Sequence, residues 1–80
     1  MRLPGDLDGP ELARALGKLG YRVTRQAGSH IRLTTTDNGE HHVTVPAHAP
    51  LRLGTLASIL DAVGRHHGIT REALLQHLLG

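Results

Sequence analysis

Apolar residues recur along this chain at two periods, and each period predicts a different kind of element. The first run has the spacing of a helix with one apolar face: Leu12, Ala13, Leu16 and Leu19. Asp8 and Glu11 precede it at the spacing of a capping box, and Gly20 follows it as a helix-ending residue. These signals predict a helix over about residues 9–19.

The next stretch alternates apolar and polar residues, which is the period of strands that bury one face. Turns are predicted at Ala27-Gly28 and at residues 37–39, where the Asn-Gly pair is a strong hairpin signal. We therefore predict an antiparallel meander of strands at about 21–26, 29–36 and 41–46. The apolar positions expected to face the core are Val23, Ile31, Leu33, Val43 and Val45.

Helical spacing returns after the strands, in two segments at about 54–63 and 70–79. Gly64 is predicted to stop the first of these helices, and Thr70 to cap the second. A connecting loop at 46–54 precedes them, and His66 and His67 are expected in the turn between them. The order α-β-β-β-α-α, without repeats or linkers, predicts one α+β domain over residues 1–80, with a three-stranded antiparallel sheet packed on helices.

Composition narrows the possible chemistry. The chain has no cysteine, Phe or Trp, and Tyr21 is its only aromatic residue, so the core is aliphatic and disulfides and thiolate metal sites are excluded. The formal charge is +2 and all but one of the cations are arginine, which favours an anionic partner, although +2 is also ordinary for a soluble domain. No apolar run is long enough to span a membrane and no signal-peptide pattern opens the chain, so we expect a cytoplasmic protein.

The sheet face turned away from the helices is predicted to be polar. Its expected residues are Arg22, Thr24, His30, Arg32, Thr34, His42 and Thr44. Because no aromatic residue is present for base stacking, this face is suited to contacts with phosphates and ribose hydroxyls. An ordinary solvated sheet face has the same composition, so the pattern alone leaves both interpretations open.

His30 differs in position from the other histidines because it follows the Gly28-Ser29 turn directly and has Arg32 on the same face. An imidazole can take a proton from a ribose 2′-hydroxyl or give one to a leaving 5′-oxygen. An arginine can bind the phosphate and stabilise the charge that develops on it. The pair is therefore a minimal set for cleaving RNA, although a surface histidine beside an arginine is more commonly inert.

Other residues are candidates for binding rather than for catalysis. The adjacent histidines at 41–42 point to opposite faces of a strand and cannot form a metal clip. His66, His67 and His77 lack a cysteine or a well-spaced carboxylate to complete a zinc site, so we expect neither metal nor cofactor. The segment around Thr55 starts a helix, where backbone N–H groups bind a phosphate or the hydroxyl serves as an ordinary cap.

Three stretches in a fixed order resemble one protein family. They are Gly-Ser-His at 28–30, Val-Pro-Ala-His at 45–48 and Gly-Thr-Leu-Ala-Ser-Ile-Leu at 54–60. Together they resemble the HicA, or YcfA-like, family of bacterial toxins, and the likeness extends over about residues 11–64. Each stretch alone is a weak signal, and the combination is much more specific.

The resemblance implies a fold similar to double-stranded-RNA-binding domains and the activity of a metal-independent, ribosome-independent mRNA interferase. It implies that His30 is the catalytic histidine, that Ser29 belongs to the turn presenting it, and that His48 and Thr55 lie in the family's other two segments. It also implies a HicB-like antitoxin that covers the active site. With Arg22 and Arg32 from the open face, these residues form the predicted RNA site. A non-catalytic module that binds RNA or the antitoxin remains the alternative.

Overall fold

The computed structural model describes residues 5–48 and 50–80 and has the predicted α-β-β-β-α-α order of an α+β fold. The predicted loop at 46–54 includes residue 49, which lies outside the described residues. The elements are α1 (Gly9–Leu16), the 3₁₀ turn η1 (Gly17–Leu19), β1 (Arg22–Ala27), β2 (His30–Thr35), β3 (His41–Pro46), α2 (Leu53–His67) and α3 (Arg71–Leu79). The strands form an antiparallel sheet in the order β1-β2-β3.

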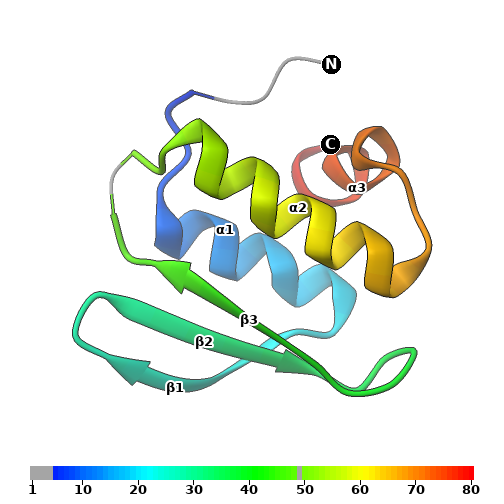
Figure 1. Cartoon of the computed structure of the whole chain (residues 1–80), viewed down its shortest axis with the longest axis horizontal. Coiled ribbons are helices and arrows are strands. Elements are labelled where there is room, and N and C mark those ends of the chain that lie inside the picture. The colour runs from blue at the N-terminus through cyan, green and yellow to red at the C-terminus, as the bar shows by residue number, and fades with distance from the viewer. Residues whose placement is uncertain (1–4, 49) are drawn as a thin grey trace.

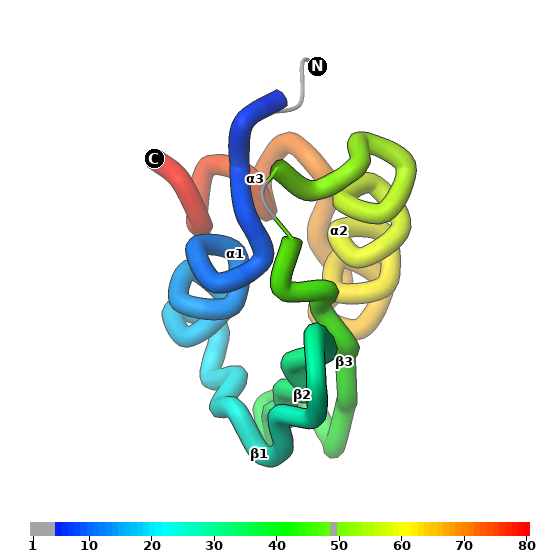
Figure 2. Tube along the Cα trace, turned by 90° about the vertical axis from the view of Figure 1, so that its left-hand side faces the viewer, coloured from blue at the N-terminus to red at the C-terminus, as the bar shows by residue number. Residues whose placement is uncertain are grey.

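One face of the sheet is covered by helices and the other is open. Figure 1 shows α1 and α2 above the sheet, and Figure 2 shows the sheet below them with α1 on one side and α2 on the other. The third helix, α3, packs against α1 and α2. The open side, called here the outer face, is not covered by any element in the described part of the chain, as predicted.

Aliphatic side chains fill the space between the sheet and the helices, as the composition predicts. The largest fully buried ones are Leu12, Leu16, Leu33, Val45, Leu56, Leu60, Val63, Leu74 and Leu78. Tyr21 joins this core with 3% of its surface exposed. Burial of apolar area on this scale is the main source of stability for a chain with no disulfide.

The start of α1 has the predicted capping box. The Glu11 backbone N–H donates to the Asp8 carboxylate at 2.8 Å, and the Asp8 backbone N–H donates to the Glu11 carboxylate at 3.1 Å. The α-helix ends at Leu16, and the rest of the predicted helix is the 3₁₀ turn. Gly20 follows it with a φ of 82°, a left-handed conformation that glycine adopts without steric cost.

The expectation that Val23 faces a covered core is wrong, because 54% of its surface is exposed. Its partner across the strands is Leu33, which is buried, so Val23 lies on the helix side of the sheet but at an uncovered edge. The register then shifts between Val23 and Arg25, which is a β-bulge. The two-residue turn that follows is Gly28-Ser29, one residue later than predicted, and Gly28 has a φ of 57°.

The second helix is longer than predicted, and a different glycine ends it. α2 runs past Gly64 to His67, so His66 and His67 lie in its last turn, and Gly68 ends it with a φ of 67°. A Cβ on Gly64 would lie 2.8 Å from the Ile69 carbonyl oxygen. This glycine therefore permits a close approach of the next segment and does not stop the helix.

Candidate active site

His30 is the first residue of β2 and pairs with Ala27 of β1 and Pro46 of β3. The ends of all three strands meet here, so His30 lies at one end of the sheet, called here the active end. Its side chain is exposed, and Ile31, the next residue, is buried, so His30 points to the outer face. Among residues 5–48 and 50–80, no side-chain hydrogen bond engages the His30 ring, which leaves both ring nitrogens open to a ligand.

Backbone hydrogen bonds fix the segments around His30. The Ala47 N–H donates to the Ser29 carbonyl at 2.6 Å, which ties the turn before His30 to the chain leaving β3. The Gly9 N–H donates to the His48 carbonyl at 2.9 Å, which ties that chain to the start of α1. Gly9 is required here, because a Cβ would collide with the Pro46 carbonyl. The turn and the exit of β3 are thus held as one unit.

A pocket of about 430 Å³ lies next to this unit. Its lining residues are Pro46, His48, Pro50, Leu51, Arg52 and Thr55. Pro46 is also the partner of His30 across β2 and β3, so one lining residue is a direct neighbour of the candidate catalytic residue. The structure therefore brings two predicted residues, His48 and Thr55, together in one pocket. His30 and Ser29 do not line that pocket.

The start of α2 differs from the prediction. The helix begins at Leu53, and Arg52 is its N-cap residue without a side-chain hydrogen bond to the helix. Thr55 is therefore in the first turn and is not the cap. Arg52 adds a cation to the pocket that sequence reasoning missed, because the helix was expected to begin at about residue 54 and not at Leu53.

The two arginines predicted to bind RNA lie at different distances from His30. Arg32 is exposed on the outer face, two residues from His30 on the same strand. Arg22 pairs with Thr34, four residues along β2 from His30. Four residues of strand span about 13 Å, so Arg22 lies near the opposite end of the sheet and is not brought together with His30.

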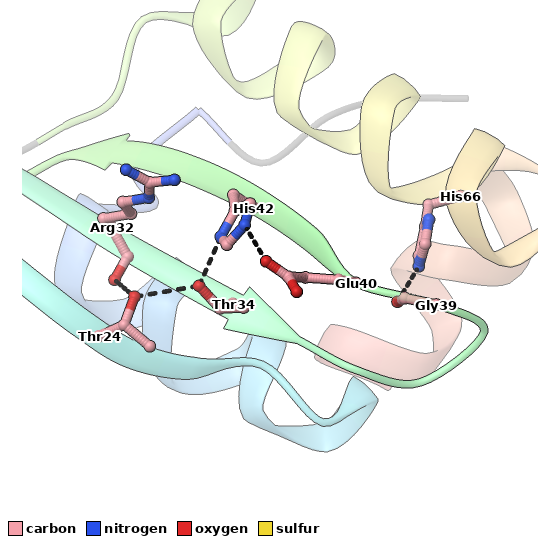
Figure 3. A network of polar contacts seen from close by, with 7 residues as sticks. All are labelled: Thr24, Arg32, Thr34, Gly39, Glu40, His42 and His66. Atoms are coloured by element: carbon pink, nitrogen blue, oxygen red, sulfur yellow. Dashed lines mark hydrogen bonds and ion pairs between the residues drawn. The ribbon is translucent and has the colours of Figure 1, made fainter.

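A chain of polar contacts crosses the outer face (Figure 3). His42 Nε2 lies 2.7 Å from a Glu40 carboxylate oxygen, and its Nδ1 lies 2.7 Å from the Thr34 hydroxyl. The Thr34 hydroxyl lies 3.0 Å from that of Thr24, which donates to the Arg32 carbonyl at 3.4 Å. Every contact has a donor and an acceptor when His42 carries both ring protons. The Glu40 carboxylate is thereby engaged by His42.

The opposite end of the sheet holds a second group of histidines, called here the Tyr–His cluster: Tyr21, His41, His66 and His67. The His41 and His66 rings stack with centroids 4.4 Å apart, and Tyr21 meets His41 and His67 edge-on. As predicted, His41 and His42 point to opposite faces. Sequence reasoning missed the cluster, because its members are up to 46 residues apart and meet only in the folded chain.

With neutral imidazole rings, one arrangement of protons gives every hydrogen bond of this cluster a donor and an acceptor. Asn38 donates to His67 Nδ1 at 3.1 Å, His67 Nε2 donates to the Tyr21 hydroxyl at 3.2 Å, and that hydroxyl donates to His41 Nδ1 at 2.7 Å. His66 Nε2 donates to backbone carbonyls of the β2–β3 turn at 2.9 and 3.0 Å. The contacts join the end of α2 to that turn.

Burial is the main influence on titration in the cluster. It lowers the pKa of His41 and of His67, and the positive charge of a protonated His66 lowers both pKa values further. Burial also raises the pKa of Tyr21 to about 12. Burial therefore favours the uncharged forms of Tyr21, His41 and His67. Within the described ranges, no group of three or more histidine or carboxylate side chains is placed to hold a metal ion.

Comparison with known proteins decides the family. The family profile described as HicA toxin of bacterial toxin–antitoxin matches residues 9–65, which is more than half of the chain. The chain belongs to the HicA toxin family. It is therefore the toxin of a toxin–antitoxin system, and an antitoxin is its partner. The matched range contains the active end, with His30, His48 and Thr55.

Two further comparisons bear on this HicA-family toxin. No curated protein and no solved structure matches it. In the part of the chain that the structure describes, no helix combines the length and the apolar character needed to cross a bilayer.

Proposed function

We propose that this HicA-family toxin is an endoribonuclease that cleaves mRNA without a ribosome or a metal ion, with His30 as its single catalytic histidine. The observation that carries the proposal is the placement of His30. Its ring is exposed on the outer face and has no intramolecular hydrogen bond among the described residues, and its cross-strand neighbour Pro46 lines a pocket. It also belongs to the Gly-Ser-His segment within the family match.

The proposed reaction is transesterification followed by release of the two RNA ends. His30 takes the proton of a ribose 2′-hydroxyl, and the 2′-oxygen attacks the adjacent phosphorus. The bond from phosphorus to the 5′-oxygen breaks, and that oxygen takes up a proton from the imidazolium or from water. The products are a 2′,3′-cyclic phosphate and a 5′-hydroxyl, and atoms and charge balance without an added cofactor.

The remaining predicted residues are proposed to bind RNA. Arg32 lies two residues from His30 and is placed for a neighbouring phosphate. His48 and Thr55 line the pocket, where polar side chains suit ribose and phosphate oxygens. Ser29 lies in the turn before His30, where its hydroxyl is proposed to contact the same strand of RNA. Arg22, at the far end of the outer face, is placed only for a more distant part of the strand.

We propose that a HicB-like antitoxin inhibits the toxin by covering the active end. Cations are exposed there and the catalytic ring is open to solvent, so an acidic surface docked over His30 and Arg32 excludes RNA directly. In a titration with the purified antitoxin, we expect the His30 imidazole resonances to shift on binding. Unchanged His30 resonances in a saturated complex would contradict this mode of inhibition.

Cleavage by purified protein with EDTA present tests the proposed activity. We expect a defined RNA to be cut into fragments with cyclic phosphate and 5′-hydroxyl ends, which phosphatase and kinase labelling distinguish from 5′-phosphate ends. Binding of RNA without cutting would instead support the alternative of a non-catalytic module on the same fold. Cleavage that stops on chelation would contradict metal independence.

A further inference from the structure

The β-bulge in β1 changes which side chains reach the outer face. Before it, Val23 pairs with Leu33, and after it, Arg25 pairs with Arg32 and Gln26 with Ile31. Strict alternation from Val23 would place Arg25 on the helix side of the sheet. The extra residue at the bulge, Thr24, also reaches the outer face, where its hydroxyl contacts Thr34. The bulge therefore turns Arg25 to the outer face.

Arg25 and Arg32 are direct cross-strand neighbours with the same charge. Like charges opposite each other destabilise a strand pair, so this placement works against stability. The other neighbour of Arg32 across the strands is Thr44, which brings no negative charge. The ion pairs formed within residues 5–48 and 50–80 are His42–Glu40 and Arg71–Asp61, so neither arginine has a carboxylate partner.

We propose that Arg25 and Arg32 together bind a phosphate of single-stranded RNA next to the one cleaved at His30. The proposal rests on the proposed function, because it takes the scissile phosphate to lie at His30. Arg32 is about 7 Å along the strand from His30, which is on the order of the separation of neighbouring phosphates in one RNA strand. A phosphate bound between the two guanidinium groups offsets the repulsion between their positive charges.

The surroundings indicate a backbone ligand rather than a base. Hydroxyls of Thr24, Thr34 and Thr44 flank the two arginines along the outer face. Hydroxyl groups suit ribose and phosphate oxygens, and the expected residues of this face include no Phe, Tyr or Trp for stacking. The proposed site therefore fixes the position of the strand and has little sequence preference of its own.

Salt-dependent RNA binding tests the site. Binding of a labelled single-stranded oligoribonucleotide is measured for Arg25→Gln, Arg32→Gln and the double variant, all carrying His30→Ala to prevent cleavage. The matched control is Arg65→Gln, an exposed arginine on α2. Because both arginines are proposed to contact one phosphate, the double change is expected to lower the slope of log affinity against log salt by about 0.7, and each single change by less than that. At low salt the double variant is expected to bind on the order of tenfold more weakly.

Thermal melting of the same variants separates binding from folding. Because each change removes one of two opposed like charges, the variants are expected to melt at or slightly above the temperature of the parent. Affinity and slopes equal to those of the Arg65→Gln control would overturn the proposal. Weaker binding that accompanies a lower melting temperature in both single variants would also overturn it, because the arginines would then be structural.

The test distinguishes this site from the proposed activity. If RNA binding depends on Arg25 and Arg32 but the parent protein cuts no RNA, the phosphate site is supported and the endonuclease proposal fails. If the parent cuts RNA while the variants bind it normally, the activity stands and the phosphate site fails. Loss of antitoxin binding with unchanged RNA binding would assign the arginines to the protein partner and overturn the RNA site.

Discussion

The two ends of the sheet both carry histidines, and their environments are opposite. At the active end, His30 is exposed and, within the described residues, makes no side-chain hydrogen bond. In the Tyr–His cluster, His41, His66 and His67 are partly buried and share a continuous set of contacts with Tyr21. A histidine that exchanges protons with a substrate needs free ring nitrogens, whereas a histidine in a network stabilises the fold.

The difference shows why residue type alone does not identify a catalytic group. The chain has seven histidines. The exposed environment of His30 differs from the networked environment of His41, His66 and His67, and the residues beside each of them in the sequence do not indicate this difference. Burial lowers the pKa of two members of the cluster, yet they have ordinary structural partners. Hydrogen bonds between distant segments mark the cluster as part of the fold, and exposure without a side-chain partner marks His30 as the candidate for chemistry.

Of the substitutions that test this comparison, one at the active end is expected to have the largest effect. His30→Ala should remove growth arrest in cells, because general acid–base catalysis contributes about 10²–10⁴-fold to a rate. The free energy of unfolding should change by less than about 0.5 kcal/mol, since the ring is exposed. Growth curves and denaturant melts of the same variant measure the two quantities. Unaltered toxicity at equal soluble expression would remove His30 from the mechanism.

A smaller effect, on stability, is expected at the cluster. His67→Ala removes the donor to the Tyr21 hydroxyl and the acceptor for Asn38, which should lower the free energy of unfolding by about 1–3 kcal/mol. RNA cleavage per folded molecule should be unchanged. His77→Ala, at an exposed position on α3, is the matched control and should leave the melting temperature unaltered. Equal stability of the two variants would show that the cluster contributes nothing.

A fall in pH should also lower the stability that the cluster contributes to the fold. The folded chain holds the pKa of His41 and His67 below the ordinary value of 6.5, so the unfolded chain binds protons first as the pH falls. Their contribution to stability is therefore complete above about pH 6.5 and is lost as the pH falls through that value toward the lowered pKa values. His66, His42 and Asp37 are the titratable groups that act on them.

Melting temperatures at pH 7.5 and pH 5.5 measure this dependence. The parent should melt at a lower temperature at the lower pH, and a His41→Ala, His67→Ala double variant should show a smaller difference between the two. A pH dependence that is the same in the parent and the double variant would assign the acid sensitivity to other groups.

The smallest effect is expected for the polar chain on the outer face. His42→Ala removes an exposed ion pair with Glu40 and a hydrogen bond to Thr34, and exposed pairs contribute about 0–1 kcal/mol. Denaturant melts of His42→Ala and Thr34→Val should therefore both lie within about 1 kcal/mol of the parent. A loss comparable to that of His67→Ala would place His42 among the structural histidines.

Sequence reasoning predicted the elements that local signals define. The capping box at Asp8 and Glu11, the left-handed Gly20 and the Asn38-Gly39 turn are all found in the structure, because each depends on residues close together in the chain. The position of His30 at the head of a strand follows from the same kind of signal. The alternation of β2 and β3 was predicted correctly for the same reason.

Features that depend on tertiary packing were not predicted. Gly64 has the sequence appearance of a helix stop, but its role is to let the Ile69 carbonyl approach α2. The bulge before Arg25 has no local signal, since Val23-Thr24-Arg25 alternates as a regular strand does. For that reason Arg25 was not predicted on the open face, whereas the structure places it opposite Arg32.

The central claim is that His30, and no other histidine of the outer face, performs the chemistry. Its most direct test is the rate of RNA cleavage by purified full-length protein with EDTA present, compared for His30→Ala and His42→Ala at equal folded concentration. We predict that His42→Ala cuts at a rate close to that of the parent and that His30→Ala gives no product above background. Cleavage by His30→Ala at the parental rate would contradict the account.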